Sequence, residues 1–151
     1  MTVGAVFLLF MADVIFNSFK KDIANGNIDL DTDTIKVMLV ASAYTPDQDL
    51  HTKRSDITNE IAGTGYSAGG AALANKTVTQ DNTNNKGIFD ADDLVWAAST
   101  LTARGAVLYK SRGGLASADE LICYIDFGAD KISDNGNFTL QWNAAGILNL
   151  S

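Results

Sequence analysis

The chain has 151 residues, 46% of them hydrophobic and 19% charged, and a formal net charge of -7 at pH 7. This composition is typical of one soluble globular domain and excludes a disordered or membrane-spanning chain, and the acidic balance disfavours binding to nucleic acid, which needs clustered Lys and Arg. Cys123 is the only cysteine, so an intrachain disulfide and a cysteine-based zinc site are both excluded.

The first ten residues, Met1 to Phe10, form an apolar run that resembles a secretory signal in composition alone. No Lys or Arg precedes the run, and Asp13 follows it without the small-residue pattern of a cleavage site. A membrane helix would need roughly 20 apolar residues. We therefore predict that Met11 is the natural start and that residues 1–10 are an upstream extension outside the fold.

Residues 11–30 are expected to form an N-terminal helix or arm. Four apolar side chains recur there at spacings of one, three and four, as on one face of a helix, and Gly26 supplies a stop signal. These candidate assembly contacts are Ile15, Phe16, Phe19 and Ile23. Such a stripe can grip a neighbouring subunit or cover one end of the chain's own domain, and both uses stay open.

Residues 31–151 are predicted to form a β-sandwich domain, because the period of the apolar residues changes to two. Residues 44–60 hold the only proline and much of the charge, which predicts an exposed connection with one short helical turn. Loops are expected at 63–70 and 81–86. Strands are expected at 35–40, 71–80, 94–98, 106–110, 121–127, 138–142 and 147–150. Seven or eight strands with little helix favour an antiparallel β-sandwich or jelly roll.

The residues that most often carry catalysis are sparse in this sequence. His51 is the only histidine and lies in a polar stretch, where a surface position is the more ordinary interpretation. Cys123 falls on the apolar face of a predicted strand, where a free cysteine behaves as a small buried hydrophobe. We therefore expect no catalytic residue and no enzymatic activity.

Three motifs imitate ligand sites without completing them. Asp29, Asp31 and Asp33 match the opening of a calcium loop, but Thr34 and Val40 occupy the positions of its glycine and bidentate glutamate. The interpretation is a polar lead-in to a strand, with no metal. The acidic group Asp90, Asp92 and Asp93 is interpreted as a solvated turn. The loop Gly63 to Ala68 matches G-x-G-x-x-A but lacks the strand and helix of a dinucleotide site, so its glycines are interpreted as serving tight turns and close strand packing. No cofactor is expected.

The order of these segments resembles a family of small structural proteins of tailed bacteriophages and prophages. The likeness runs from about Met11 to the end of the chain. The residues that carry it are Ile35 to Val40, Ala43 to Pro46, Thr58 to Glu60, Gly63 to Tyr66, Gly69-Gly70, Leu121 to Gly128 and Trp142 to Leu150.

The resemblance implies a virion component assembled in the cytoplasm of the bacterial host, with capsid decoration or cement as the favoured role. Its partners would be further copies of itself and other virion proteins such as the major capsid protein, with no direct contact to nucleic acid or membrane. Such a role needs a stable β-domain with self-complementary edges and an apolar or extended arm.

Two alternatives stay open. The first is a tail or neck subunit of the same particle, which differs from a decoration protein only in its neighbours. The second is a carbohydrate- or receptor-binding β-sandwich, for which an exposed Trp96 or Trp142 would act as a stacking platform. Both tryptophans fall on apolar faces of predicted strands, which favours the core for them.

Overall fold

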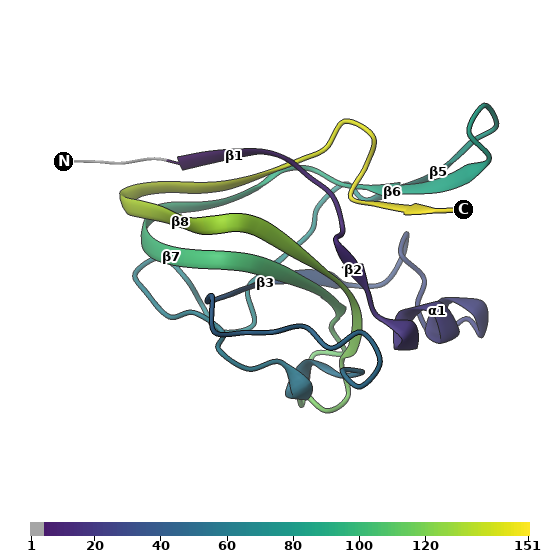
Figure 1. The fold of residues 1–151 in the computed structure, drawn as a ribbon, viewed down its shortest axis with the longest axis horizontal. Helices are drawn as coiled ribbons and strands as arrows, with labels where there is room; N and C mark the ends of the chain where they lie inside the picture. Colours follow the sequence, from purple (N-terminus) through teal and green to yellow (C-terminus); the bar gives the residue numbers. More distant parts are fainter. Residues whose placement is uncertain (1–4) are drawn as a thin grey trace.

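The structure, a computed structural model, describes the backbone of residues 5–151 and the side chains of residues 11–151. Within these residues the chain forms nine strands, one α-helix and one short 3-10 helix (Figure 1). In chain order they are β1 (Ala5–Phe10), β2 (Val14–Ile15), α1 (Asn17–Ala24), β3 (Ile35–Val40), η1 (Arg54–Asp56), β4 (Ala71–Ala72), β5 (Thr77–Asp81), β6 (Lys86–Asp90), β7 (Leu94–Lys110), β8 (Glu120–Trp142) and β9 (Leu148–Leu150).

The strands form two sheets, which confirms the predicted β-sandwich with a short helix near its N-terminus. The larger sheet has the order β1-β8-β7-β3-β4, with β2 also paired to β8, and the smaller has the order β5-β6-β9. The two sheets contain six and three strands, whereas a jelly roll has eight strands in two sheets. The term β-sandwich therefore describes the fold better than the term jelly roll. In Figure 1 the long strands β7 and β8 run side by side, and the β5–β6 hairpin lies beyond them, near the C-terminus.

The larger sheet buries side chains on both of its faces. Ile35, Val37 and Leu39 of β3 join the main core, which also takes in residues of the smaller sheet such as Phe89. The alternate residues Met38 and Val40 instead enter a second core, which includes Tyr44 from the connection after β3. This arrangement follows from the period of two in a strand, and it explains why Ile35–Val40 is apolar at five of six positions.

Two pairs of predicted strands are each one long strand. The predicted strands 94–98 and 106–110 are joined in β7, and 121–127 and 138–142 are joined in β8. The residues between them pair with each other across the two strands, from Ser99 opposite Gly136 to Ala103 opposite Lys131, with irregularities in the register on either side of this stretch. The predicted breaks were wrong because strand pairing continues through stretches of mainly polar sequence, in which only small or isolated apolar residues such as Leu101 and Ala103 reach the core.

The predicted strand 71–80 is divided between the two sheets. β4 pairs with β3 in the larger sheet, whereas β5 pairs with β6 in the smaller one. Asn75 has a φ of 51° and so lies in the left-handed region that ends a strand. The strand β6, which the sequence analysis missed, follows the predicted polar turn at 81–86.

The N-terminal residues also differ from the expectation. Ala5–Phe10 forms β1, which pairs in parallel with the end of β8, so the expectation that residues 1–10 lie outside the fold is wrong for these six residues. The physical reason is that the edge of β8 offers unpaired backbone groups to an extended apolar segment. Residues 1–4 lie outside the described residues, and the start at Met11 stays a prediction.

Candidate functional site

The four predicted assembly contacts lie against the chain's own domain. Phe16 and Phe19 are fully buried, Phe16 in the second core and Phe19 in the main core. Ile15 and Ile23 are half-buried against the main core. Phe16 and Phe19 are therefore not contacts of an exposed arm, because each is buried in a core of the chain's own domain. Of the two uses left open by the sequence, the cover over one end of the domain is the one that the structure shows for these two side chains.

His51 and Cys123 are both held in structural roles. The Nδ1 atom of His51 accepts a hydrogen bond from the backbone N–H of Asp47 at 3.2 Å and lies 3.0 Å from the hydroxyl of Tyr44, whose ring stacks on the imidazole. Cys123 is fully buried in the main core, and burial raises the pKa of its thiol above the ordinary value. A thiol that stays protonated is a poor nucleophile.

The calcium-like aspartates stabilise the turn before β3. A hydrogen bond from the Thr32 side chain lowers the pKa of Asp29 below its ordinary value, and hydrogen bonds from the backbone N–H groups of Asp31 and Thr32 lower it further. The Asp33 carboxylate accepts a hydrogen bond from the backbone N–H of Asp29 and forms an ion pair with Lys110. The interpretation as a strand lead-in is consistent with these contacts. Within the described part of the chain, no group of three or more His, Cys, Asp or Glu could hold a metal ion.

The two tryptophans are buried and do not form a stacking platform. Trp96 packs edge-on against Phe138, and Trp142 donates its ring N–H to the backbone carbonyl of Asp92 at 2.9 Å. Asp93 accepts a hydrogen bond from the backbone of Trp142. The acidic turn at 90–93 thus holds the end of β8 against the start of β7. The sequence-based expectation that both tryptophans belong to the core is confirmed, and neither is available as the exposed platform that the carbohydrate-binding alternative would use.

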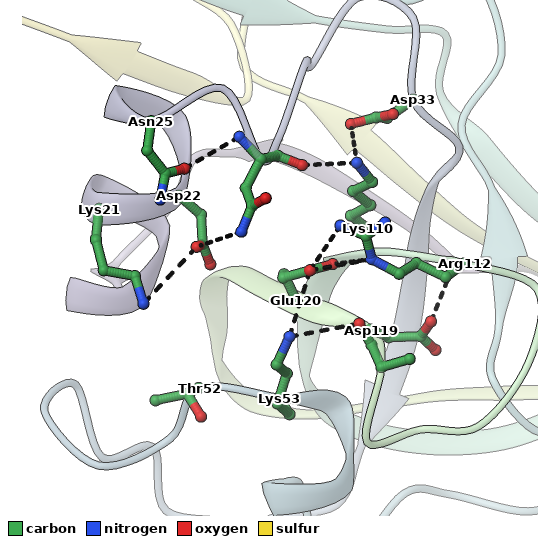
Figure 2. Close-up of polar contacts among 12 residues, drawn as sticks. Lys21, Asp22, Asn25, Asp33, Thr52, Lys53, Lys110, Arg112, Asp119 and Glu120 are labelled. Atoms are coloured by element: carbon green, nitrogen blue, oxygen red, sulfur yellow. Dashed lines mark hydrogen bonds and ion pairs between the residues drawn. The ribbon is translucent and has the colours of Figure 1, made fainter.

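A group of charged side chains surrounds Glu120, at the start of β8 (Figure 2). Arg112 binds both carboxylate oxygens of Glu120, with its Nε at 3.0 Å from each and its Nη2 at 2.8 Å from Oε1. Lys53 approaches the same carboxylate at 3.3 Å. Burial alone would raise the pKa of Glu120, but the hydrogen bonds from Arg112 and Lys53 outweigh it and lower the pKa. Glu120 therefore stays ionised although its side chain is almost completely buried.

Asp119 links this charge cluster to η1, in the connection between β3 and β4. Its carboxylate accepts 2.7 Å hydrogen bonds from the Nε of Arg54 and from the backbone N–H of Arg112. The guanidinium of Arg54 also lies 5.2 Å from the ring centre of Tyr109. These contacts fix the connection against the end of the sheet, which is a structural role. Sequence analysis missed the cluster because its members are far apart in the chain.

A polar hollow of about 340 Å³ lies beside β8 and the connection after β3. The Arg104 and Asp126 side chains pair in it at 2.7 Å, and Asp13 accepts a hydrogen bond from the backbone of Asp126. The bond from Arg104 lowers the pKa of Asp126. Since these groups already bind each other, the hollow offers few unpaired polar groups to a ligand.

A cavity of about 490 Å³ lies between the smaller sheet and the segment that follows α1, and we call it the apolar groove. Gly87 of β6 lines it, and a Cβ atom at this position would meet only carbonyl oxygens, the nearest at 3.9 Å. The apolar side chains that line the groove are Ile23, Ile28, Leu30, Val78, Ile88, Phe89 and Leu150. Ile23 is thus the one predicted contact that borders an opening with a mainly apolar wall.

The strand β5 forms one margin of this groove and one edge of the smaller sheet. It pairs with β6 on one side only. Thr77 to Gln80 are all exposed, and the Val78 side chain lines the groove while it stays 52% exposed. The sequence signal for this edge is the run Thr77-Val78-Thr79-Gln80, which has strand propensity but only one large apolar residue.

Neither a search for membrane spans nor comparison with known proteins assigns a further role to the chain. In the part of the chain that the structure describes, α1 is too short for a membrane span and no other helix has the required length and apolarity. Comparison of the chain with protein-family models, with curated protein sequences and with solved structures gave no match.

Proposed function

We propose that this chain is a structural protein of a tailed-phage virion, and that it decorates the capsid and stabilises the head. The resemblance of segment order in the sequence supports a virion component. The fold is consistent with a virion component, because both faces of the larger sheet carry buried core residues. Such packing stabilises a domain that can present assembly contacts on its surface.

The observation that carries the proposal is the open edge of β5 beside the apolar groove. An unpaired strand edge offers regularly spaced N–H and C=O groups to another chain. The adjoining apolar wall offers apolar surface whose burial would stabilise the association. Exposed surface of this kind is what an assembly protein needs. The partners in this proposal are further copies of the chain and the major capsid protein.

A tail or neck subunit would use the same edge, so the two virion roles are distinguished by location. The test compares particles from a phage or prophage that encodes the chain with particles from a strain that lacks its gene. We expect mass spectrometry to find the chain in purified particles, and the mutant heads to lose DNA at a lower temperature than wild-type heads. Absence of the chain from purified particles would contradict the virion proposal, and unchanged heads with altered tails would favour the tail or neck role.

A further inference from the structure

We propose that two copies of this chain pair through β5, antiparallel and about a two-fold axis, so that their two smaller sheets join into one sheet of six strands. This inference rests on the proposed assembly function and names the surface and the partner. It requires only surface that the single chain leaves exposed.

The first argument is the chemistry of the edge. Among the edge strands whose side chains the structure describes, β5 is the longest, with five residues against two each in β2 and β4 and three in β9. Proteins protect exposed edges with Lys, Pro or a bulge within the strand. Thr77 to Gln80 contain neither Lys nor Pro, and their pairing with β6 proceeds without a register shift. The edge is therefore open to pairing.

The second argument is that the strand is self-complementary. A two-fold axis perpendicular to the sheet places one residue opposite its own copy. With Val78 on the axis, each Thr77 faces Thr79 of the second copy. Val–Val and Thr–Thr are both favourable cross-strand pairs. The flanking charges do not oppose each other, because Lys76 then faces Gln80 of the second copy.

The third argument is electrostatic. The chain carries a net charge of -7, which opposes association of two copies in general. The β5–β6 hairpin with the residue before it is neutral, since Lys76 and Lys86 balance Asp81 and Asp90. Two acidic chains meet here with less repulsion than at a surface that carries a share of the net charge.

The fourth argument is the continuity of the groove. The pairing of β5, β6 and β9 places Val78, Phe89 and Leu148 across from one another on one face of the smaller sheet. In the dimer the second Val78 extends this apolar row, and each copy covers the exposed part of the other's valine. The two apolar grooves then lie on the same face of a continuous sheet.

The test uses the full chain and two substitutions of Val78. Val78→Lys places two like charges on the axis, and we expect it to raise the dimer Kd by about tenfold or more, as measured by sedimentation equilibrium. Val95→Lys is the matched control, since Val95 lies in the larger sheet and is 51% exposed, almost as much as Val78. Equal Kd values for the two variants would overturn the inference.

Cross-linking tests the register. Val78→Cys is expected to form a covalent dimer of twice the 16.0 kDa chain mass under diamide, faster than Thr79→Cys and Val95→Cys. The native Cys123 is buried and does not compete. A faster reaction of Thr79→Cys, or no difference among the three, would overturn the proposed pairing. The proposed virion role is tested separately, by the presence of the chain in purified particles. A chain that does not pair through β5 could still be present in those particles.

Discussion

Phe19→Ala measures whether the N-terminal helix belongs to the core. Phe19 is fully exposed in the arm interpretation, whereas in the structure it is fully buried in the main core. Removal of a buried phenylalanine side chain costs about 3–5 kcal/mol, through lost transfer free energy and the cavity that remains. Because 1 kcal/mol lowers the Tm of a domain of this size by about 2–4 °C, we expect the Tm to fall by about 6–20 °C.

Urea unfolding followed by tryptophan fluorescence and circular dichroism gives the free energy of unfolding for the wild type and the variant. The matched control is Ile132→Ala, since Ile132 is 55% exposed, and we expect it to change the free energy by less than about 0.5 kcal/mol. A Phe19→Ala variant that unfolds at the wild-type urea concentration would refute the packing of α1 on its own domain. Loss of oligomers without loss of stability would instead return the segment to the role of an arm.

The remaining predictions concern the charge cluster and one close backbone contact. Glu120→Gln is expected to lower the free energy of unfolding at pH 7 by about 1–3 kcal/mol, the range for a buried hydrogen-bonded charge whose partners, such as Arg112, can still reach solvent. Since the pKa of Glu120 is lower in the folded chain, wild-type stability should be lost as the pH falls below the ordinary glutamate value of 4.5, and Glu120→Gln should reduce that slope in urea titrations; an unchanged slope would contradict it. Gly70→Ala is expected to cost more than Gly113→Ala, because both have a positive φ but a Cβ at Gly70 would also collide with the backbone of Val37 and lie 2.8 Å from the Met38 Cα. Equal losses in thermal unfolding would show that this close approach does not occur.

Local pattern predicted most of the fold. The strand Ile35–Val40, the turn at 81–86 and the stop of α1 before Gly26 follow from period, turn residues and a left-handed glycine, and the structure confirms them. The continuous strands β7 and β8 could not be predicted, because their middle segments are mainly polar, contain few large apolar residues and are held by pairing with each other. Cross-strand hydrogen bonding is a tertiary property that a single segment does not encode.

The candidate site was predicted less well than the fold. The stripe of Ile15, Phe16, Phe19 and Ile23 was recognised as amphipathic, but its spacing does not say whether the apolar face meets the same chain or another one. The β5 edge carries a weaker signal, since its residues are mostly polar and become an edge only through the order of strands in the sheet. The apolar groove beside it is lined by residues of α1, of the segment after α1 and of the smaller sheet, which lie far apart in the sequence.

Cryo-electron microscopy of intact particles from the encoding phage or prophage tests the central claim most directly. The account predicts density of this chain at regular lattice positions on the capsid, with neighbouring copies joined where β5 of one copy meets β5 of another. Density confined to the neck or tail would contradict capsid decoration, and particles without the chain would contradict a virion role altogether.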